Sequence, residues 1–235
     1  VADDVHLGGT LGKYAVESLQ AKKVAVIDDR TAYGQGVADE FEKGVVAAGG
    51  TVVGREFTND KATDFNAILT TLKSKQPEVV FFGGMDAVAG PMLKQMKQLG
   101  LNVKFMGGDG VCTGELPKLA GDGMSDEQVY CAEAGGVEDA GKPAMDKFRA
   151  DYKAKFNEDV KLYAPYVYDA TKLMVEAMVR AGSSDPAQYL PELKATNHQG
   201  VSGQIVFDEK GDIKNGALTL YTYRGGERAA LAVIR

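Results

Sequence analysis

The stretch KVAVIDDRTAYGQG, residues 23–36, decides the fold class of this chain. It opens with a continuous apolar run, as expected of a strand that helices cover on both faces. It then passes through two acids into a Tyr-Gly-x-Gly segment, after which apolar residues recur at helical spacing. A strand that leads through a short loop into a helix forms the start of a βα unit. The stretch therefore predicts a parallel sheet.

The same unit recurs through the first half of the chain. Apolar runs at 23–29, 51–57, 78–83, 103–108 and 128–132 begin 25 to 28 residues apart, the spacing of successive βα units. The segments between them carry apolar stripes with helical periodicity. These observations predict a doubly wound α/β domain.

The second half follows another pattern. Helical stripes dominate to about residue 196, and strand-like runs return only at 203–208 and 218–223, with a turn at 209–212 between them. A helical layer of this kind needs a sheet to cover, and the sequence does not supply a second parallel one. We therefore expect this region to be incomplete or to need a partner.

Composition excludes several function classes. The net charge is −6 with acids and bases interspersed, so we expect no nucleic-acid partner. No apolar run approaches the ~20 residues that a membrane span needs, so we expect no direct membrane insertion. The chain opens at Val1 without the features of a signal peptide, and we expect any such segment to have been removed.

Cys112 and Cys131 are the only cysteines. Their spacing matches no metal motif and His6 and His198 are isolated, so we expect no metal site. A disulfide between the cysteines is one interpretation, given an oxidising compartment. Two small buried hydrophobic side chains are the other.

The candidate site lies where strands end, because open parallel sheets bind ligands at their carboxyl ends. Tyr33 follows the first strand, Gly84 and Met85 follow the third, and Gly108 and Asp109 follow the fourth. The glycines allow the backbone to approach a ligand closely.

Each side chain in this group also has a structural alternative. Tyr33 offers an aromatic wall with a polar tip, or packs at a helix entry. Asp109 offers a charge for a ligand ammonium, or is a turn acid, since Asp-Gly is a common turn pair. Met85 lines an apolar pocket or simply packs. The residues alone leave these alternatives open.

Motifs for catalysis are lacking. The sequence has no Gly-x-Gly-x-x-Gly after the first strand, no Walker motif and no Gly-x-Ser-x-Gly elbow. We therefore expect no cofactor and no enzymatic activity, with a hydrolase as the remaining enzymatic alternative.

Several segments together resemble the periplasmic Leu/Ile/Val-binding proteins. They are TAYGQG at 31–36, DF at 64–65, FFGG at 81–84, GL at 100–101, FMG at 105–107, LAG at 119–121 and GVSGQIVFDEKGD at 200–212. Their order and spacing are specific, and the resemblance runs over essentially the whole chain. It begins at the family's first crossover, so about the first third of a typical member is absent.

The resemblance implies a type I periplasmic binding fold, in which two α/β lobes joined by three crossovers hold the ligand between them. Residues 1–133 would form the complete, Rossmann-like ligand-binding lobe. Residues 134–206 would be the helical part of the other, partial lobe, and 207–235 a crossover with one or more return strands.

Hinges are implied near Glu133 and Gly135 and again around 208–215, beginning at Asp208. The third would lie near the start of the chain.

The resemblance also implies a function: capture of a small amino acid, above all a branched-chain aliphatic one, in the periplasm for an ABC permease. Tyr33 matches the family's ligand-contacting tyrosine, and Asp109 matches an acid that binds the α-ammonium group. Met85 stands where some members have an aromatic residue, and the groups that hold the α-carboxylate belong to the absent part. The alternative is a sensing domain of the same fold in chemotaxis or gene regulation.

Overall fold

A computed structural model of the chain describes residues 1–133, 135, 142–161, 163–214 and 216–234. The chain forms two compact units. The sheet unit comprises Asp3–Ala134 and Leu218–Ile234, and the helical unit comprises Gly135–Ala217 together with Val1–Ala2. Residues 207–217, which we expected in the crossover region, therefore belong to the helical unit.

The sheet unit is built on seven strands in the order β2-β1-β3-β4-β5-β8-β9. They are β1 (Lys23–Asp28), β2 (Thr51–Phe57), β3 (Val79–Gly83), β4 (Lys104–Gly107), β5 (Val129–Glu133), β8 (Leu218–Arg224) and β9 (Glu227–Ile234). The first five pair in parallel, whereas β8 joins β5 and β9 joins β8 antiparallel. The predicted parallel sheet is confirmed, with each of its five strands within one residue of the predicted bounds.

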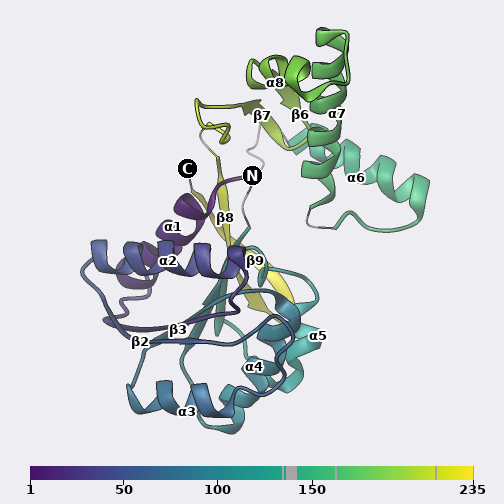
Figure 1. Cartoon of the computed structure of the whole chain (residues 1–235). Coiled ribbons are helices and arrows are strands. Elements are labelled where there is room, and N and C mark those ends of the chain that lie inside the picture. Colours follow the sequence, from purple (N-terminus) through teal and green to yellow (C-terminus); the bar gives the residue numbers. More distant parts are fainter. Residues whose placement is uncertain (134, 136–141, 162, 215, 235) are drawn as a thin grey trace. The chain divides into compact units, whose positions relative to one another are not determined.

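Helices cover both faces of this sheet (Figure 1). They are α1 (Asp4–Glu17), α2 (Ala32–Ala47), α3 (Asn66–Ser74), α4 (Asp86–Gln98) and the short α5 (Leu116–Ala120). Successive side chains of a strand point to opposite faces, and β3 shows the result. Phe81 stacks on Phe41 of α2 at 3.9 Å between ring centroids, whereas Phe82 joins a core cluster with Leu69 of α3 and Met92 of α4. The unit is therefore doubly wound.

Helix α1 has no counterpart among the predicted elements. Its glycines allow its backbone to lie directly against α2: a Cβ on Gly8 would be 2.5 Å from the carbonyl oxygen of Val37, and one on Gly12 2.3 Å from that of Phe41. A Gly-rich segment favours a loop in sequence reasoning, but here the missing side chains are what let the two helices meet.

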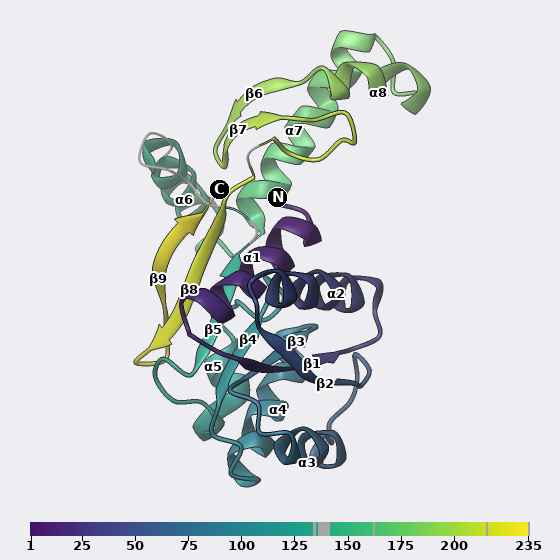
Figure 2. The same cartoon turned by 90° about the vertical axis from the view of Figure 1, so that its left-hand side faces the viewer.

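Among its described residues, the helical unit contains three helices and a hairpin. They are α6 (Lys142–Phe156), α7 (Ala164–Ala181), α8 (Pro186–Lys194), β6 (Asn197–Gly200) and β7 (Gly203–Val206). The hairpin lies beside α7 (Figure 2), where the buried Asp169 accepts hydrogen bonds from the backbone N–H groups of Val201 (3.0 Å) and Ser202 (2.8 Å). This polar contact fixes the hairpin turn on the helix.

Large apolar side chains of the helical unit are exposed. Val167, Val175 and Val179 of α7 are all more than half exposed, up to 74% for Val179. Others are Phe156, Tyr163, Tyr168, Met174 and Leu190. An apolar stripe on a helix normally faces a core, so these residues form a layer without the sheet that it would cover, as expected for a partial lobe.

Candidate ligand-binding site

The site begins in the loop between β1 and α2, which its own side chains close. Asp29 Oδ1 accepts hydrogen bonds from the backbone N–H (3.0 Å) and the hydroxyl (2.6 Å) of Thr31. The Thr31 hydroxyl oxygen in turn accepts one from the N–H of Gly34 at 2.9 Å and caps α2. Tyr33 lies in the first turn of this helix, so the cap fixes the backbone from which its side chain extends.

Tyr33 reaches the loop after β4, 76 positions further along the chain. Its hydroxyl donates to Asp109 Oδ1 at 2.7 Å. The N–H of Gly110 donates to the Tyr33 hydroxyl oxygen and to Asp109 Oδ1, at 3.1 Å in both cases. The two side chains predicted from separate strand ends thus meet, with the carboxylate held by a phenol and a backbone amide.

The predicted glycines and Met85 complete the cluster. A Cβ on Gly110 would lie 2.6 Å from the carbonyl oxygen of Gly84, 2.7 Å from the Met85 sulfur and 3.2 Å from Tyr33 Cε1. A Cβ on Gly108 would lie 2.6 Å from the Tyr33 hydroxyl oxygen. The three loops approach so closely that only glycine fits, and Met85 remains 44% exposed beside them.

The surroundings of Asp109 are acidic. Burial raises the pKa of Asp4 in α1, and the nearby carboxylate of Asp109 raises it further, followed by Asp3 and Glu40. Burial is the larger cause, and the charges of the neighbouring carboxylates add to it in making the ionised form of Asp4 unfavourable. A cation at this point would therefore be stabilised. Sequence reasoning missed Asp4, because only the packing of α1 brings it near Asp109.

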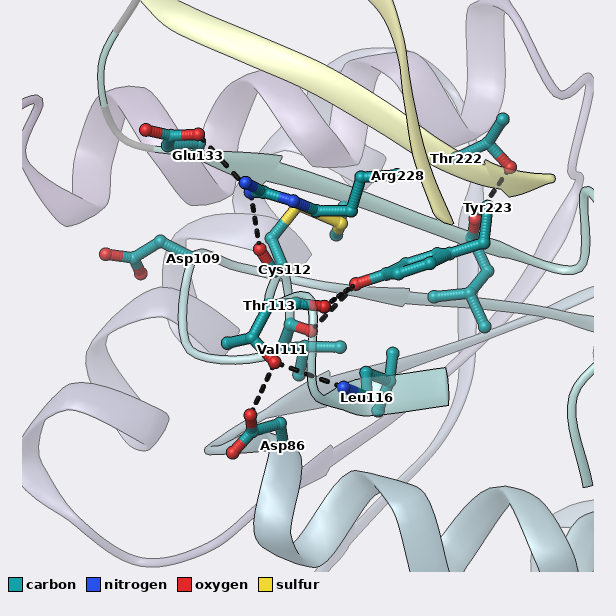
Figure 3. The surroundings of a disulfide bond; sticks show 12 residues. Asp86, Asp109, Val111, Cys112, Thr113, Leu116, Glu133, Thr222, Tyr223 and Arg228 are labelled. Carbon is teal, nitrogen blue, oxygen red and sulfur yellow. Dashed lines mark hydrogen bonds and ion pairs between the residues drawn. A yellow bond between two sulfur atoms is a disulfide. The ribbon is translucent and has the colours of Figure 1, made fainter. Parts of the chain in front are cut away.

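The loop after Asp109 is fastened to its neighbours (Figure 3). A disulfide joins Cys112 to Cys131 of β5, with 5.3 Å between their Cα atoms. The Thr113 hydroxyl donates to Asp86 Oδ2 at 2.5 Å, and the buried Tyr223 of β8 donates to the Thr113 carbonyl oxygen at 2.7 Å. Of the two interpretations of the cysteines, the structure thus has the disulfide.

Of the residues expected at hinges, Glu133 and Gly135 lie at a boundary between the two units, whereas Asp208 does not. Glu133 ends β5 at one boundary between the units, and Gly135 is the first described residue beyond it. Asp208 lies inside the helical unit, where its carboxylate accepts from the N–H groups of Asp212, Lys210 and Gly211, which lower its pKa. It closes the predicted turn, and the next boundary falls at Ala217, beyond the segment 208–215.

Two observations concern whether the site could hold a metal ion. Asp29 Oδ2 is buried without a hydrogen-bond partner. Within the described ranges, no group of three or more His, Cys, Asp or Glu side chains is arranged to hold a metal ion.

In the described part of the chain, no helix has the length and apolar character to cross a membrane.

An open parallel sheet with aromatic, acidic and glycine residues gathered at its carboxyl edge is typical of α/β proteins that bind small molecules. The particular family follows from comparison: the chain belongs to the periplasmic binding protein family, whose model matches residues 2–227.

Similar sequences agree with this assignment. A leucine-, isoleucine-, valine-, threonine- and alanine-binding protein of Pseudomonas aeruginosa is 33% identical over 92% of this chain and 57% of its own length. A Leu/Ile/Val-binding protein homolog of Brucella abortus is 33% identical over 95% of this chain and 59% of its own length. The chain thus spans somewhat more than half the length of these relatives.

Solved structures show the same fold. A leucine-binding protein from Thermotoga maritima superimposes with a TM-score of 0.88 at 28% identity, over 98% of this chain and 65% of the other. A branched-chain amino acid transporter substrate-binding protein from Streptococcus pneumoniae, in complex with isoleucine, gives 0.83 at 26% identity, over 99% and 65%. The fold is therefore that of a type I periplasmic binding protein, with one lobe complete and the other partial.

Proposed function

We propose that this chain belongs to a solute-binding protein that captures a small amino acid, above all a branched-chain aliphatic one, and delivers it to an ABC permease. The observation that carries the proposal is the Tyr33–Asp109 hydrogen bond at the carboxyl edge of the sheet, beside the exposed Met85. One relative is named a leucine-, isoleucine-, valine-, threonine- and alanine-binding protein and another a Leu/Ile/Val-binding protein homolog, which supports the ligand class. The family's extracytoplasmic setting supports a periplasmic location.

In this proposal each residue has a distinct role. Asp109 pairs with the α-ammonium group, because a cation taken out of water needs a compensating charge. Tyr33 holds the Asp109 carboxylate in place through its hydroxyl and presents its ring to the ligand's side chain. Met85 adds a flexible apolar surface. The absence of a side chain at Gly108 leaves room for the Tyr33 hydroxyl, since a Cβ there would lie 2.6 Å from its oxygen.

The acidic surroundings favour an ammonium-bearing ligand over a plain carboxylic acid. Burial raises the pKa of Asp4 and the charge of Asp109 raises it further, and a cation bound beside these two carboxylates offsets that unfavourable charge contact. In this proposal, the ligand's α-carboxylate is held by other groups of the two-lobe site. Binding then shifts an open–closed equilibrium about hinges at Glu133 and Gly135.

Isothermal calorimetry on the complete gene product tests the proposal. We expect leucine, isoleucine and valine to bind, and 4-methylpentanoate, which is leucine without its ammonium group, to bind far more weakly. Asp109→Asn should weaken leucine binding by about 2–4 kcal/mol, roughly 30- to 1000-fold in Kd, because it removes one partner of a charge pair.

Asp122→Asn is the matched control. Asp122 is exposed and pairs only at the surface with Lys97 (3.2 Å), so its variant should bind like the wild type. If Asp109→Asn binds leucine as tightly as the wild type, the ammonium assignment is wrong. If the wild type binds none of the three amino acids, the proposed ligand class is wrong.

A further inference from the structure

The loop of residues 108–113 presents Asp109 from a compact turn. The N–H of Val111 donates to the carbonyl oxygen of Gly108 at 3.1 Å, and that of Cys112 donates to the carbonyl oxygens of Gly108 (3.2 Å) and Asp109 (3.1 Å). A turn this short transmits a shift in one peptide directly to the next. The position of the Cys112 carbonyl therefore helps to set the direction of the Asp109 side chain.

Arg228 of β9 holds that carbonyl. Its Nη1 donates to the Cys112 carbonyl oxygen at 2.8 Å, and the same nitrogen lies 3.4 Å from Glu133 Oε2 (Figure 3). The guanidinium also lies over the Tyr221 ring, 4.7 Å from its centroid. The side chains of Arg228 and Glu133 are only 25% and 15% exposed, so solvent screens the pair little.

These contacts fix the guanidinium in three ways at once: by a hydrogen bond, an opposite charge and an aromatic face. A planar guanidinium with several donors suits this combination, whereas a lysine ammonium lacks the flat surface that stacks on a ring. Glu133 matches the charge of Arg228 and so allows a cation to be held at the base of the loop.

We propose that Arg228 is a positioning residue of the ligand site: by fixing the Cys112 carbonyl it holds the loop that presents the Asp109 carboxylate. The inference rests on the proposed role of Asp109. It adds that Arg228 of the return hairpin β8–β9, 116 positions after Cys112, helps to set ligand affinity.

The hairpin supplies its own control. Arg224 of β8 pairs with Glu127 at 2.8 Å, but both side chains are about half exposed and the pair lies on the turn side of the hairpin. The change Arg224→Gln removes an Arg–Glu pair from the same hairpin without removing a hydrogen bond to the loop. A general effect of weakening the hairpin would appear in this variant too.

Leucine binding by calorimetry is the first test. We expect Arg228→Gln to raise Kd about tenfold, which corresponds to ~1.4 kcal/mol. Arg228→Lys should recover part of this loss, and Arg224→Gln should leave Kd unchanged. In the Asp109→Asn background, Arg228→Gln should have little further effect, because residues that act through one another are not additive. Equal losses in Arg224→Gln, or full additivity with Asp109→Asn, would overturn the proposal.

Amide hydrogen exchange without ligand is the second test. The peptide that covers residues 108–113 should exchange faster in Arg228→Gln and Arg228→Lys than in the wild type, and at the wild-type rate in Arg224→Gln. Unchanged exchange in both Arg228 variants contradicts the proposal. Because this measurement needs no ligand, it separates failure of the positioning role from failure of the amino-acid assignment.

Discussion

The sheet unit and the helical unit use the same kind of amphipathic helix with opposite results. In the part of the chain that the structure describes, the buried apolar side chains of the helical unit are Met145, Pro165, Leu173, Ala177, Ile205 and Ala217. All the other buried apolar residues belong to the sheet unit, whose helices lie on both faces of a seven-stranded sheet. Periodicity thus determines where a helix forms, but whether its apolar face is buried depends on a partner element.

Polar contacts also differ between the two units. In the sheet unit they converge on the strand ends, where Tyr33 and Asp109 meet. Among the described residues of the helical unit, the most buried carboxylate is that of Asp169, which anchors a hairpin turn. The sheet unit therefore brings the proposed ligand-binding residues together by its own contacts, whereas the helical unit depends more on local anchors for its shape.

Matched phenylalanine substitutions test this comparison with the largest expected effect. Phe41 in α2 is fully buried against Phe81, and Phe156 at the end of α6 is 54% exposed. Phe41→Ala should cost about 3–5 kcal/mol of unfolding free energy, because it leaves a cavity in a packed core. Phe156→Ala should change it by no more than about 0.5 kcal/mol. Urea unfolding followed by circular dichroism measures both.

The two substitutions could also show that the units are equally well packed. Similar losses for Phe41→Ala and Phe156→Ala would mean that the α6 surface is buried in solution. If Phe156→Ala destabilised the complete gene product but not this chain, the apolar layer would instead be a surface that other parts of the gene product cover.

The disulfide gives the next largest effect, confined to the sheet unit. Cys112 and Cys131 are 19 positions apart. Replacing both by alanine should lower the unfolding free energy of the sheet unit by about 3 kcal/mol, because the unfolded chain regains the freedom of that loop. Dithiothreitol should destabilise the wild type similarly.

The double variant is its own control for the reductant. Dithiothreitol should leave its unfolding curve unchanged, since no other cysteine is present. A reductant effect of equal size on the double variant would show that the destabilisation does not come from this bond.

The parts of the molecule that sequence reasoning predicted are those that depend on local pattern. The five parallel strands are apolar because both their faces are covered, and Tyr33, Met85 and Asp109 could be located because each follows a strand end. Helix α1 was missed because its glycines look like a loop until α2 lies against them.

Other features depend on contacts between distant segments. The sequence does not indicate that Asp4 lies near Asp109, or that Arg228 pairs with Glu133. The sequence predicts a boundary at 206/207 because the turn at Asp208 resembles a break, whereas contacts within the structure group residues up to Ala217 with the helical unit.

The smallest expected effect concerns Tyr223, which ties the β8 strand to the Asp109 loop. Its ring is fully buried and its hydroxyl donates to the Thr113 carbonyl oxygen at 2.7 Å. Tyr223→Phe should cost about 1 kcal/mol at pH 7, the net value of one hydrogen bond. Tyr168→Phe in the helical unit, where the side chain is 43% exposed, should cost almost nothing.

Alkaline pH should reduce the difference between wild type and Tyr223→Phe. Burial raises the pKa of Tyr223 above its ordinary value of 10.0, so the folded protein keeps the neutral phenol that donates the bond. The contribution of Tyr223 is therefore complete below pH 10 and is lost as the pH rises from there through the folded-state pKa, because the unfolded chain ionises first. Urea unfolding at pH 7 and near pH 11 should show the wild type losing more stability than Tyr223→Phe. Parallel losses in the two proteins would mean that the hydroxyl reaches water, and that the return hairpin holds the Asp109 loop less tightly than its buried contacts indicate.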